Sequence, residues 1–309
     1  MLSAAELRHF AEKGWVLRPA VFSEAECREL RDATDCEIDA AAGPERDKLL
    51  GMREADDEDG AHFGRMVVSG TQDSVAGPST AIRAEVFRKW RRHPAIVPAL
   101  EQLLGCAPQF TGSMVLVTPP HARRHEPEMR EVLRDSGEMV WHRGIRPKWG
   151  VRQGARPGEI YTSWLHTCTF LSDISHTDDG GTLMLSGSHR LDVESTTGAA
   201  PEPEESLGRA GRVVHQVPDW AECLRNREQA VGPAGSVVHF SEALIHAGLA
   251  VLSETTRYAM FVDCTPSAMA TGDKSTDTRV GWRPQEIVKE PWDLAGPEYD
   301  NPLVRMHKL

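Results

Sequence analysis

Residues 235–263 read GSVVHFSEALIHAGLAVLSETTRYAMFVD. A β-prone run ends near Phe240, a short apolar turn follows with His246 at its end, and a second β-prone run begins around Arg257. In a double-stranded β-helix, the spacing of eleven residues brings a histidine at one strand end into the same interior as an arginine one strand further along. A neutral imidazole suits Fe(II), and a guanidinium suits the far carboxylate of a keto acid. The stretch therefore predicts both a strand pair and a candidate site.

Short β-prone runs fill the second half of the chain. They lie between clusters of Gly, Pro and Asp, which is typical of an antiparallel sandwich or barrel and not of alternating strands and helices. The runs are QFTGSMVLV, EMVWH, IYTSWLHTCTFL, GTLMLS, RVVHQV, GSVVHF and RYAMFVDCT. We predict a mainly β fold with flanking helices, in which residues 106–266 form a cupin-like double-stranded β-helix, or jelly roll.

The first third of the chain has a helical pattern. Residues 3–40 contain two S-x-x-E sequences typical of capping boxes, beginning at Ser3 and Ser23, with the extended run GWVLRPAVF between them. Residues 43–79 are polar and rich in Gly and Asp, and they predict a loop that could serve as a lid. A further helical pattern follows. We expect residues 1–105 to be a mostly helical buttress with one polar loop.

The chain shows no internal repeat and no linker. Residues 192–211 are an acidic loop rich in Pro and Gly, and residues 267–309 predict an irregular tail. We therefore expect residues 1–309 to form a single domain.

The composition argues against several classes of protein. A hydrophobic share of 40% and a charged share of 26% are ordinary for a soluble globular protein. The formal net charge of -11 argues against binding to nucleic acid or to a membrane surface, because both attract basic proteins. No stretch is long enough to span a membrane, no apolar signal core opens the chain, and the six cysteines form no C-x-x-C pair. We predict a reduced, cytoplasmic protein.

A second candidate site lies in EMVWHRGIRPKWG, residues 138–150. His142 ends a short apolar run, and Gly144 stands two residues further on. From these residues alone, His142 is either a packed strand histidine or half of a metal-ligand pair whose second member is missing. A literal His-x-Asp occurs at His176 and Asp178, in a turn just before GGTLMLSGSHR.

Three further stretches carry a resemblance to a known family. These are FAEKGWVLRPAVFSEAECRELRDA, LSDISHTDDGGTLMLSGSHR and HAGLAVLSETTR. Together they resemble the phytanoyl-CoA dioxygenase-like family of Fe(II)/2-oxoglutarate-dependent oxygenases, over about residues 10–265. The resemblance implies a jelly-roll fold, with Fe(II), 2-oxoglutarate and O2 as cofactors.

The resemblance also assigns the iron ligands. The family's proximal motif is His-x-Asp, usually preceded by Trp, and its counterpart here is WHRG, with Gly144 where the Asp should be. The implied protein ligands are His142 and His246, and the implied 2-oxoglutarate contacts are Arg257 and Thr169. The rival His-x-Asp falls where the family has an Asn-Gly turn and no ligand, so we interpret it as a solvated turn.

The missing carboxylate changes the expected chemistry. A triad of two histidines and one carboxylate leaves three open positions on iron, and a glycine at position 144 frees a fourth with room for chloride. This His-x-Gly variant resembles the Fe(II)/2-oxoglutarate halogenases, which chlorinate an unactivated C–H bond. The alternatives are a dead iron site, or a hydroxylase that uses water or another carboxylate such as Glu159.

A basic stretch follows the proposed ligand. Residues 139–158 contain no Asp or Glu but hold five cations. The stretch is either a solvated loop or a clamp for a phosphate or carboxylate, in which Arg offers bidentate contacts. Nearby Trp side chains could stack on a flat ring. The predicted substrate contacts are Arg143, Arg146, Lys148, Arg152 and Trp164.

An anionic molecule with a flat ring fits both features, and a nucleotide is the simplest example. The chain is similar to the nucleotide-acting halogenases of nucleoside-antibiotic pathways, which implies chlorination at the 2′ carbon of a purine deoxynucleotide monophosphate such as dAMP. The alternatives are a carrier-bound aminoacyl group, a free amino acid, or a non-catalytic cupin-like binding module. His239 is expected to be a wall or core residue, and His166 faces either the interior or the core.

Overall fold

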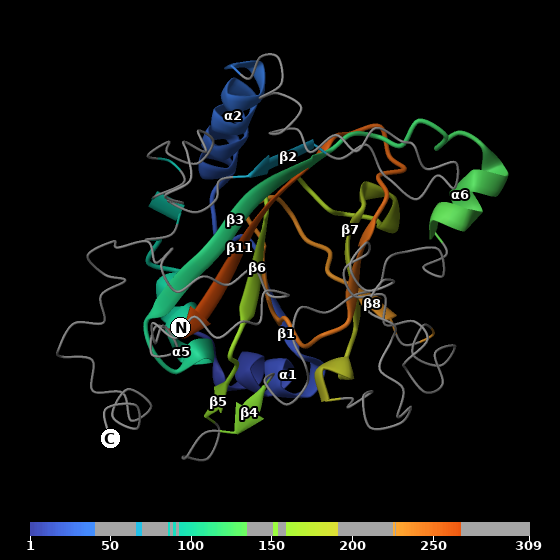
Figure 1. Ribbon diagram of the computed structural model, residues 1–309. Helices are drawn as coiled ribbons and strands as arrows, with labels where there is room; N and C mark the ends of the chain where they lie inside the picture. The colour runs from blue at the N-terminus through green and yellow to red at the C-terminus, as the bar shows by residue number, and fades with distance from the viewer. Residues whose placement is uncertain are drawn as a thin grey trace, which may run out of the picture.

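The computed structural model describes residues 1–40, 66–69, 86, 89–90, 93–134, 151–153, 159–190, 225 and 227–266. Over these ranges the chain forms two antiparallel sheets, and helices pack on the outer face of the larger one (Figure 1). The mainly β architecture with flanking helices is confirmed. The predicted loop at 192–211 and the tail at 267–309 lie outside the described residues. In the part of the chain that is described, no helix is both long and apolar enough to cross a membrane.

The larger sheet has six strands in the order β1-β9-β6-β11-β3-β2. Their bounds are β1 Trp15–Arg18, β2 Met66–Ser69, β3 Pro108–Thr118, β6 Leu165–Phe170, β9 Val237–Ser241 and β11 Arg257–Pro266. The smaller sheet has the order β10-β7-β8, with β7 Gly181–Leu185, β8 Arg227–Gln229 and β10 His246–Leu249. A separate pair joins β4 Arg152–Gln153 to β5 Ile160–Tyr161.

One expectation about the N-terminal region is wrong. Residues 43–79 were expected to form a loop, but Met66–Ser69 pair with β3 as the edge strand β2. The run MVVS contains two adjacent β-branched residues, which favour a strand even inside a polar segment.

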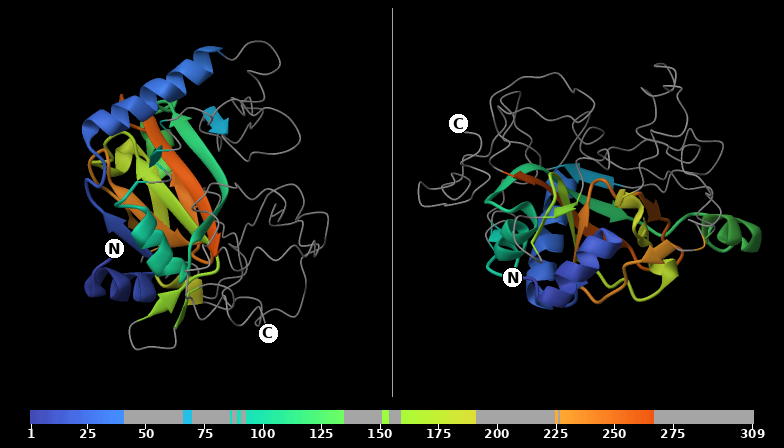
Figure 2. Two further views of the ribbon diagram at one scale, coloured as in Figure 1. Left: turned by 90° about the vertical axis from the view of Figure 1, so that its left-hand side faces the viewer. Right: turned by 90° about the horizontal axis from the view of Figure 1, so that it is seen from below.

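The helices begin where the capping sequences predict. In α1, Ala4–Lys13, the Ser3 hydroxyl accepts from the Glu6 backbone N–H, and the Glu6 carboxylate accepts from the Ser3 backbone N–H. Ser23 and Glu26 make the same reciprocal contacts at the start of α2, Glu24–Ala40. Two further helices whose bounds the structure describes are α5 Val97–Leu104 and α6 Pro127–Arg134. Figure 2 shows α2 lying across one end of the larger sheet, while α6 stands at the edge of the molecule beyond β7 in Figure 1.

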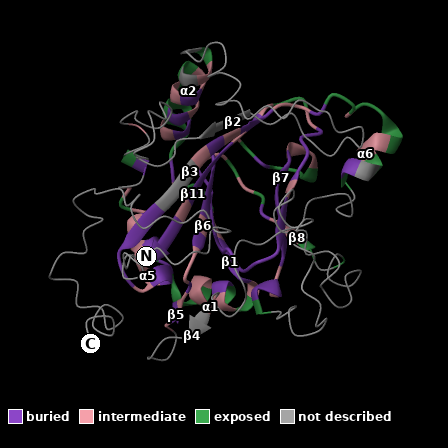
Figure 3. Cartoon of the chain, viewed as in Figure 1, coloured by how far each residue is buried: buried purple, intermediate pink, exposed green. Residues whose placement is uncertain are grey.

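The alternation of side chains along β11 separates two apolar cores. Met260 and Val262 pack on the helix-covered outer face, in a core that includes Leu30 of α2. Ala259 and Phe261 point to the inner face, where they join a core that includes Met184 of β7 in the smaller sheet. Figure 3 shows β6, β7 and β11 as mostly buried. Odd-numbered residues of β11 therefore enter the interior between the sheets, because the period of a strand is two.

A glycine ties the N-terminal segment to the larger sheet. The carbonyl of Gly235 accepts from the backbone N–H groups of Val21 and Phe22, at 2.8 and 3.0 Å. Gly235 has a φ of 86°, in the left-handed region. A Cβ at this position would lie 2.0 Å from the carbonyl oxygen of Phe22. Only glycine allows the two backbone segments to approach this closely.

Candidate active site between the two sheets

Arg257, the first residue of β11, places a buried cation at one end of the interior. The residue is 2% exposed, and its Nη1 donates to the carbonyl oxygen of Gly181 at the start of β7 at 3.0 Å. Its Nε has no hydrogen-bond partner among the described residues. Burial lowers the pKa of the guanidinium, because the charged form is the one that loses hydration. A buried cation with an unused donor is suited to receive a carboxylate.

His246, the first residue of β10, presents one ring nitrogen as a ligand. The residue is 6% exposed and lies opposite Met184 of β7. Its Nδ1 is 2.9 Å from the carbonyl oxygen of Leu244. Because a carbonyl can only accept, Nδ1 carries the proton and Nε2 keeps its lone pair. Metal-ligating histidines are oriented by this kind of backbone hydrogen bond, so His246 fits an iron ligand.

A second group of titratable side chains lies close to His246. The Nδ1 of His166 on β6 is 2.5 Å from Oε1 of Glu242 and 2.7 Å from Oδ1 of Asp263. The three ligand atoms lie within 4.8 Å of one another, so the group could also hold a metal ion. We call these residues the acid–histidine cluster. The rings of His166 and His246 have centroids 6.3 Å apart.

The acid–histidine cluster holds its imidazole as a cation. Burial alone would lower the pKa of His166, but Asp263 and Glu242 outweigh that effect and raise the pKa to about 10. The cluster therefore combines one positive charge with two carboxylates. Phe240 stacks on His166 at a centroid distance of 4.8 Å, and Phe261 meets it edge-on at 5.1 Å.

These groups follow one another along the interior. On β7, Arg257 contacts Gly181, and His246 faces Met184 three residues further along. On β11, Asp263 pairs with His166 on β6, at the opposite end of the strand from Arg257. The order is therefore Arg257, then His246, then the acid–histidine cluster.

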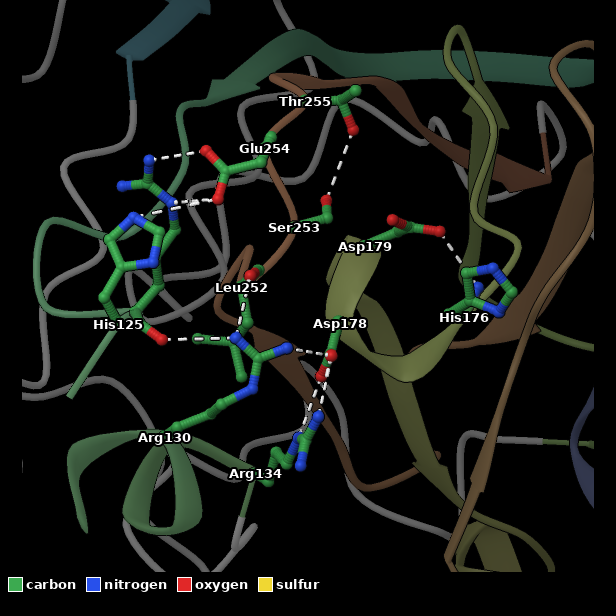
Figure 4. A network of polar contacts seen from close by, with 11 residues as sticks. His125, Arg130, Arg134, His176, Asp178, Asp179, Leu252, Ser253, Glu254 and Thr255 are labelled. Carbon is green, nitrogen blue, oxygen red and sulfur yellow. Dashed lines mark hydrogen bonds and ion pairs between the residues drawn. The ribbon is translucent and has the colours of Figure 1, made fainter. Parts of the chain in front are cut away.

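The rival His-x-Asp does not form a metal site. His176 is exposed, and its backbone N–H donates to Asp179 at the start of the turn η4, Thr177–Asp179. The carboxylate of Asp178 points toward α6, where it accepts from Arg130 and from Nε and Nη2 of Arg134, at 2.8 and 2.7 Å for Arg134 (Figure 4). Asp178 anchors α6 and is turned away from His176. We expected a solvated turn, and the structure shows an anchored one.

The structure separates Thr169 from Arg257. Thr169 lies on the face of β6 opposite Cys168 and Phe170, where its hydroxyl accepts from the Trp90 indole N–H at 2.9 Å. The side chain is thus committed to the helix-covered face, and its expected role in 2-oxoglutarate binding is wrong. His239 lies on the same outer face, fully buried, with its Nδ1 3.0 Å from the Thr167 hydroxyl. It is a wall residue, as expected.

The predicted substrate contacts are only partly described. Trp164 is half-buried, and its carbonyl accepts from the backbone N–H of Glu242, so it borders the acid–histidine cluster. Arg152 is in the short strand β4, which pairs with β5. The remaining predicted residues lie outside the described part of the chain. These are His142, Gly144, Arg143, Arg146 and Lys148.

Two residues of the cluster were missed at the level of sequence. Asp263 follows Arg257 at an even spacing within one β-prone run, so strand periodicity could have placed it on the same face. Glu242 carries no such signal, because it sits in an apolar turn and reaches His166 only through the pairing of β6 with β9.

Comparison with known proteins identifies the fold and the family. The family model described as phytanoyl-CoA dioxygenase matches residues 10–259. No curated protein matches the chain. Among solved structures, HygX from Streptomyces hygroscopicus with nickel and 2-oxoglutarate bound is similar over 86% of this chain and 88% of its own, at 15% identity and a TM-score of 0.52.

Two similar structures come from nogalamycin biosynthesis. The non-heme alpha ketoglutarate dependent epimerase SnoN is 14% identical with a TM-score of 0.52, and covers 85% of this chain and 82% of its own. The carbocyclase SnoK is 19% identical with a TM-score of 0.51, and covers 86% and 85%. At these identities the likeness establishes the fold, and it confirms the jelly-roll core.

Proposed function

The chain belongs to the phytanoyl-CoA dioxygenase family of Fe(II)/2-oxoglutarate-dependent enzymes, and within this family we propose that it is a halogenase acting on a purine deoxynucleotide monophosphate. The proposed iron ligands are His142 and His246, with chloride in the position left vacant at Gly144. The observation that carries the proposal is the WHRG sequence, which places glycine two residues after the proposed proximal histidine.

The described residues fit the two cofactors. The backbone hydrogen bond from Nδ1 of His246 fixes the tautomer in which Nε2 carries a lone pair, and this nitrogen is the proposed iron ligand. The buried Arg257, whose Nε lacks a partner in the described part of the chain, would bind the distal carboxylate of 2-oxoglutarate. When bound, iron, 2-oxoglutarate and O2 supply oxidative removal of a hydrogen atom from a substrate C–H bond, with succinate and CO2 as by-products. The part played by this chain is to position those groups and exclude water around them.

The vacancy at Gly144 supports halogenation over hydroxylation. A carboxylate at this position would occupy a coordination site and add one negative charge. Glycine leaves the coordination site open and contributes no negative charge. An anion from solution can fill the site and supply the charge, and chloride is small enough to enter.

The nucleotide assignment rests on charge and on ring stacking. The segment after His142 carries Arg143, Arg146, Lys148 and Arg152 without a neighbouring acid, which suits a phosphate. Trp164 offers an aromatic surface beside the interior. The best candidate is therefore dAMP, chlorinated at its 2′ carbon. A carrier-bound aminoacyl group or a free amino acid is the alternative substrate.

One observation favours a second candidate, a hydroxylase. The acid–histidine cluster brings two carboxylates close to His246, and either Glu242 or Asp263 could supply the carboxylate that position 144 lacks. Such a site would hold iron with a complete set of two histidines and one carboxylate, and chloride would not be needed.

A single experiment separates the two candidates. Protein loaded anaerobically with Fe(II) and 2-oxoglutarate is mixed with dAMP and then with O2, in buffer with or without chloride, and the products are analysed by mass spectrometry. The halogenase predicts a product with the chlorine isotope pair that is formed only with chloride, and a brominated product with bromide. Turnover that ignores chloride and yields only hydroxylated product would establish the hydroxylase.

A further inference from the structure

The acid–histidine cluster has more acceptors than donors. One nitrogen, Nδ1 of His166, faces oxygens of both Glu242 and Asp263, and it carries a single proton to share between them. One imidazole therefore faces two carboxyl groups, one buried on Glu242 and one partly buried on Asp263. Such groups are costly to hold together with little contact to water unless a further donor satisfies them. The geometry therefore calls for a donor from outside the cluster.

Two more buried acceptors lie at the same end of the interior. Thr265 follows Asp263 by two residues on β11, so both point to the inner face. Gln109 on β3 is the cross-strand partner of Thr265, beyond a register shift at Asp263. Both residues are at most 4% exposed, and neither Oε1 of Gln109 nor Oγ1 of Thr265 has a hydrogen-bond partner among the described residues. The Gln109 oxygen adds an acceptor at this end of the interior, and the Thr265 hydroxyl can either accept or donate.

Aromatic side chains border the same acceptors. Phe240 and Phe261 enclose the His166 ring from two sides, and the backbone of Trp164 is joined to that of Glu242. These apolar side chains keep water away from the acceptors, which strengthens a hydrogen bond from a donor that reaches them.

The position of the acid–histidine cluster suits it to bind the substrate and not 2-oxoglutarate. It lies beyond His246 as seen from Arg257, and the proposed function places 2-oxoglutarate between those two residues. A group bound at the cluster is therefore on the side of the iron that the cosubstrate leaves for the substrate.

We propose that His166, Glu242 and Asp263, extended by Gln109 and Thr265, form a subsite that binds the amino-bearing edge of a purine base. This inference rests on the proposed function, because it assumes a nucleotide substrate with its phosphate at the basic segment. The carboxylates accept from the exocyclic amino group of the base.

The test compares two nucleotides that differ only in the amino group. Anaerobic protein with Fe(II) and 2-oxoglutarate is titrated by calorimetry with dAMP and with the deoxypurine monophosphate that has hydrogen at position 6. The wild-type protein should bind dAMP roughly tenfold to a hundredfold more tightly, as expected for a hydrogen bond to a charged group. Glu242→Gln and Asp263→Asn should each remove most of this preference.

A matched control makes the same chemical change elsewhere. Glu254→Gln removes the charge of an exposed carboxylate that pairs with Arg124, far from the interior, and should retain the full preference. Thermal unfolding of each variant shows whether it is folded.

Several results would overturn the proposal of a purine-binding subsite. Equal binding of the two nucleotides by the wild-type protein would do so, as would an undiminished preference in both cluster variants, or failure of both nucleotides to bind. Binding of two Mn²⁺ ions per chain, reduced to one in Asp263→Asn, would show that the cluster is a cation site instead. The halogenase proposal is judged separately, because a preference for dAMP with purely hydroxylated product would keep the subsite and reject halogenation.

Discussion

Arg257 and Asp263 extend from the same face of β11 at opposite ends of the interior. Six residues at the rise of an extended strand separate them by about 20 Å. The interior therefore has a cationic end and an acidic end, with His246 between them. This polarity orients both ligands of the proposed reaction, since the dicarboxylate cosubstrate is attracted to one end and a donor group to the other.

Replacing Arg257 should remove the binding of 2-oxoglutarate without unfolding the protein. Loss of one side of a buried guanidinium–carboxylate contact costs about 3–5 kcal/mol, so Arg257→Met should raise the half-saturating concentration of 2-oxoglutarate by at least about a hundredfold. Met removes a buried charge but also the Nη1 hydrogen bond to the Gly181 carbonyl, and because these two effects oppose each other, thermal stability without 2-oxoglutarate should change little. Arg124→Met, at an exposed ion pair, serves as the control. Near-normal saturation in Arg257→Met would reject the assignment.

Replacing either proposed iron ligand should abolish iron binding at the active site. His246→Ala and His142→Ala should each lose the visible charge-transfer band of the Fe(II)–2-oxoglutarate complex. His176→Ala should keep it, because Asp178 is bound to α6 and the His-x-Asp there makes no metal site. If the band survives in His142→Ala but disappears in His166→Ala, the iron belongs to the acid–histidine cluster.

Restoring a carboxylate at position 144 should exclude chloride. In Gly144→Asp, the new side chain would occupy the vacant position and repel the halide by like charge. Chlorinated product should vanish while iron is retained, leaving hydroxylated product or succinate formed without product. Gly144→Ala, which adds one methyl group and no charge, is the matched control and should retain chlorination. Continued chlorination by Gly144→Asp would show that the halide binds elsewhere.

Strands β3, β6, β7, β9 and β11 were predictable because they depend on local pattern, namely β-prone runs between turn residues, and the spacing of eleven placed His246 and Arg257 at strand starts. The acid–histidine cluster was not predictable, because Glu242 meets His166 only through the register of strands far apart in the chain. The role given to Thr169 failed for a related reason. Alternation along β6 defines two faces, but which face is the interior depends on where Trp90 and the helices pack.

His239 should make the protein sensitive to acid. Burial, with a smaller contribution from Arg18, lowers the pKa of His239 to about 3. Below the unfolded pKa of about 6.5, the unfolded chain therefore binds a proton that the folded chain does not. The contribution of His239 to the free energy of unfolding is therefore fully present above a pH of about 6.5. It is lost as the pH falls from about 6.5 toward 3, by about 1.4 kcal/mol per pH unit.

Urea denaturation at pH 5, 6 and 7 tests this slope. His239→Gln can keep the hydrogen bond to Thr167 but cannot titrate, so its free energy of unfolding should fall less steeply in acid than that of the wild type. The exposed His176→Gln should keep the wild-type slope. A slope unchanged in His239→Gln would mean that another group causes the acid sensitivity.

Two glycines with the same backbone conformation should differ in their tolerance of alanine. Gly235 and Gly187 have φ values of 86° and 85°, so each substitution incurs about 1–2 kcal/mol of left-handed strain. At Gly187 the nearest atoms to a new Cβ are 3.7 Å away, whereas at Gly235 the Phe22 carbonyl oxygen lies at 2.0 Å. Gly235→Ala should therefore cost about 1–3 kcal/mol more than Gly187→Ala in chemical denaturation. Equal losses in the free energy of unfolding would show that the backbone at Phe22 moves away from the new methyl group without loss of stability.

Asp178 sets a limit on chain reach. It holds Arg130 and Arg134 of α6, and His142 is only eight positions after Arg134 in the sequence. Eight residues span at most about 28 Å when fully extended, so the ion pair acts as a tether on the proposed proximal ligand. High ionic strength weakens such partly exposed pairs. The affinity for iron should therefore decline with added salt in the wild-type protein. In Asp178→Asn it should be lower at every salt concentration, although Asp178 does not contact the metal.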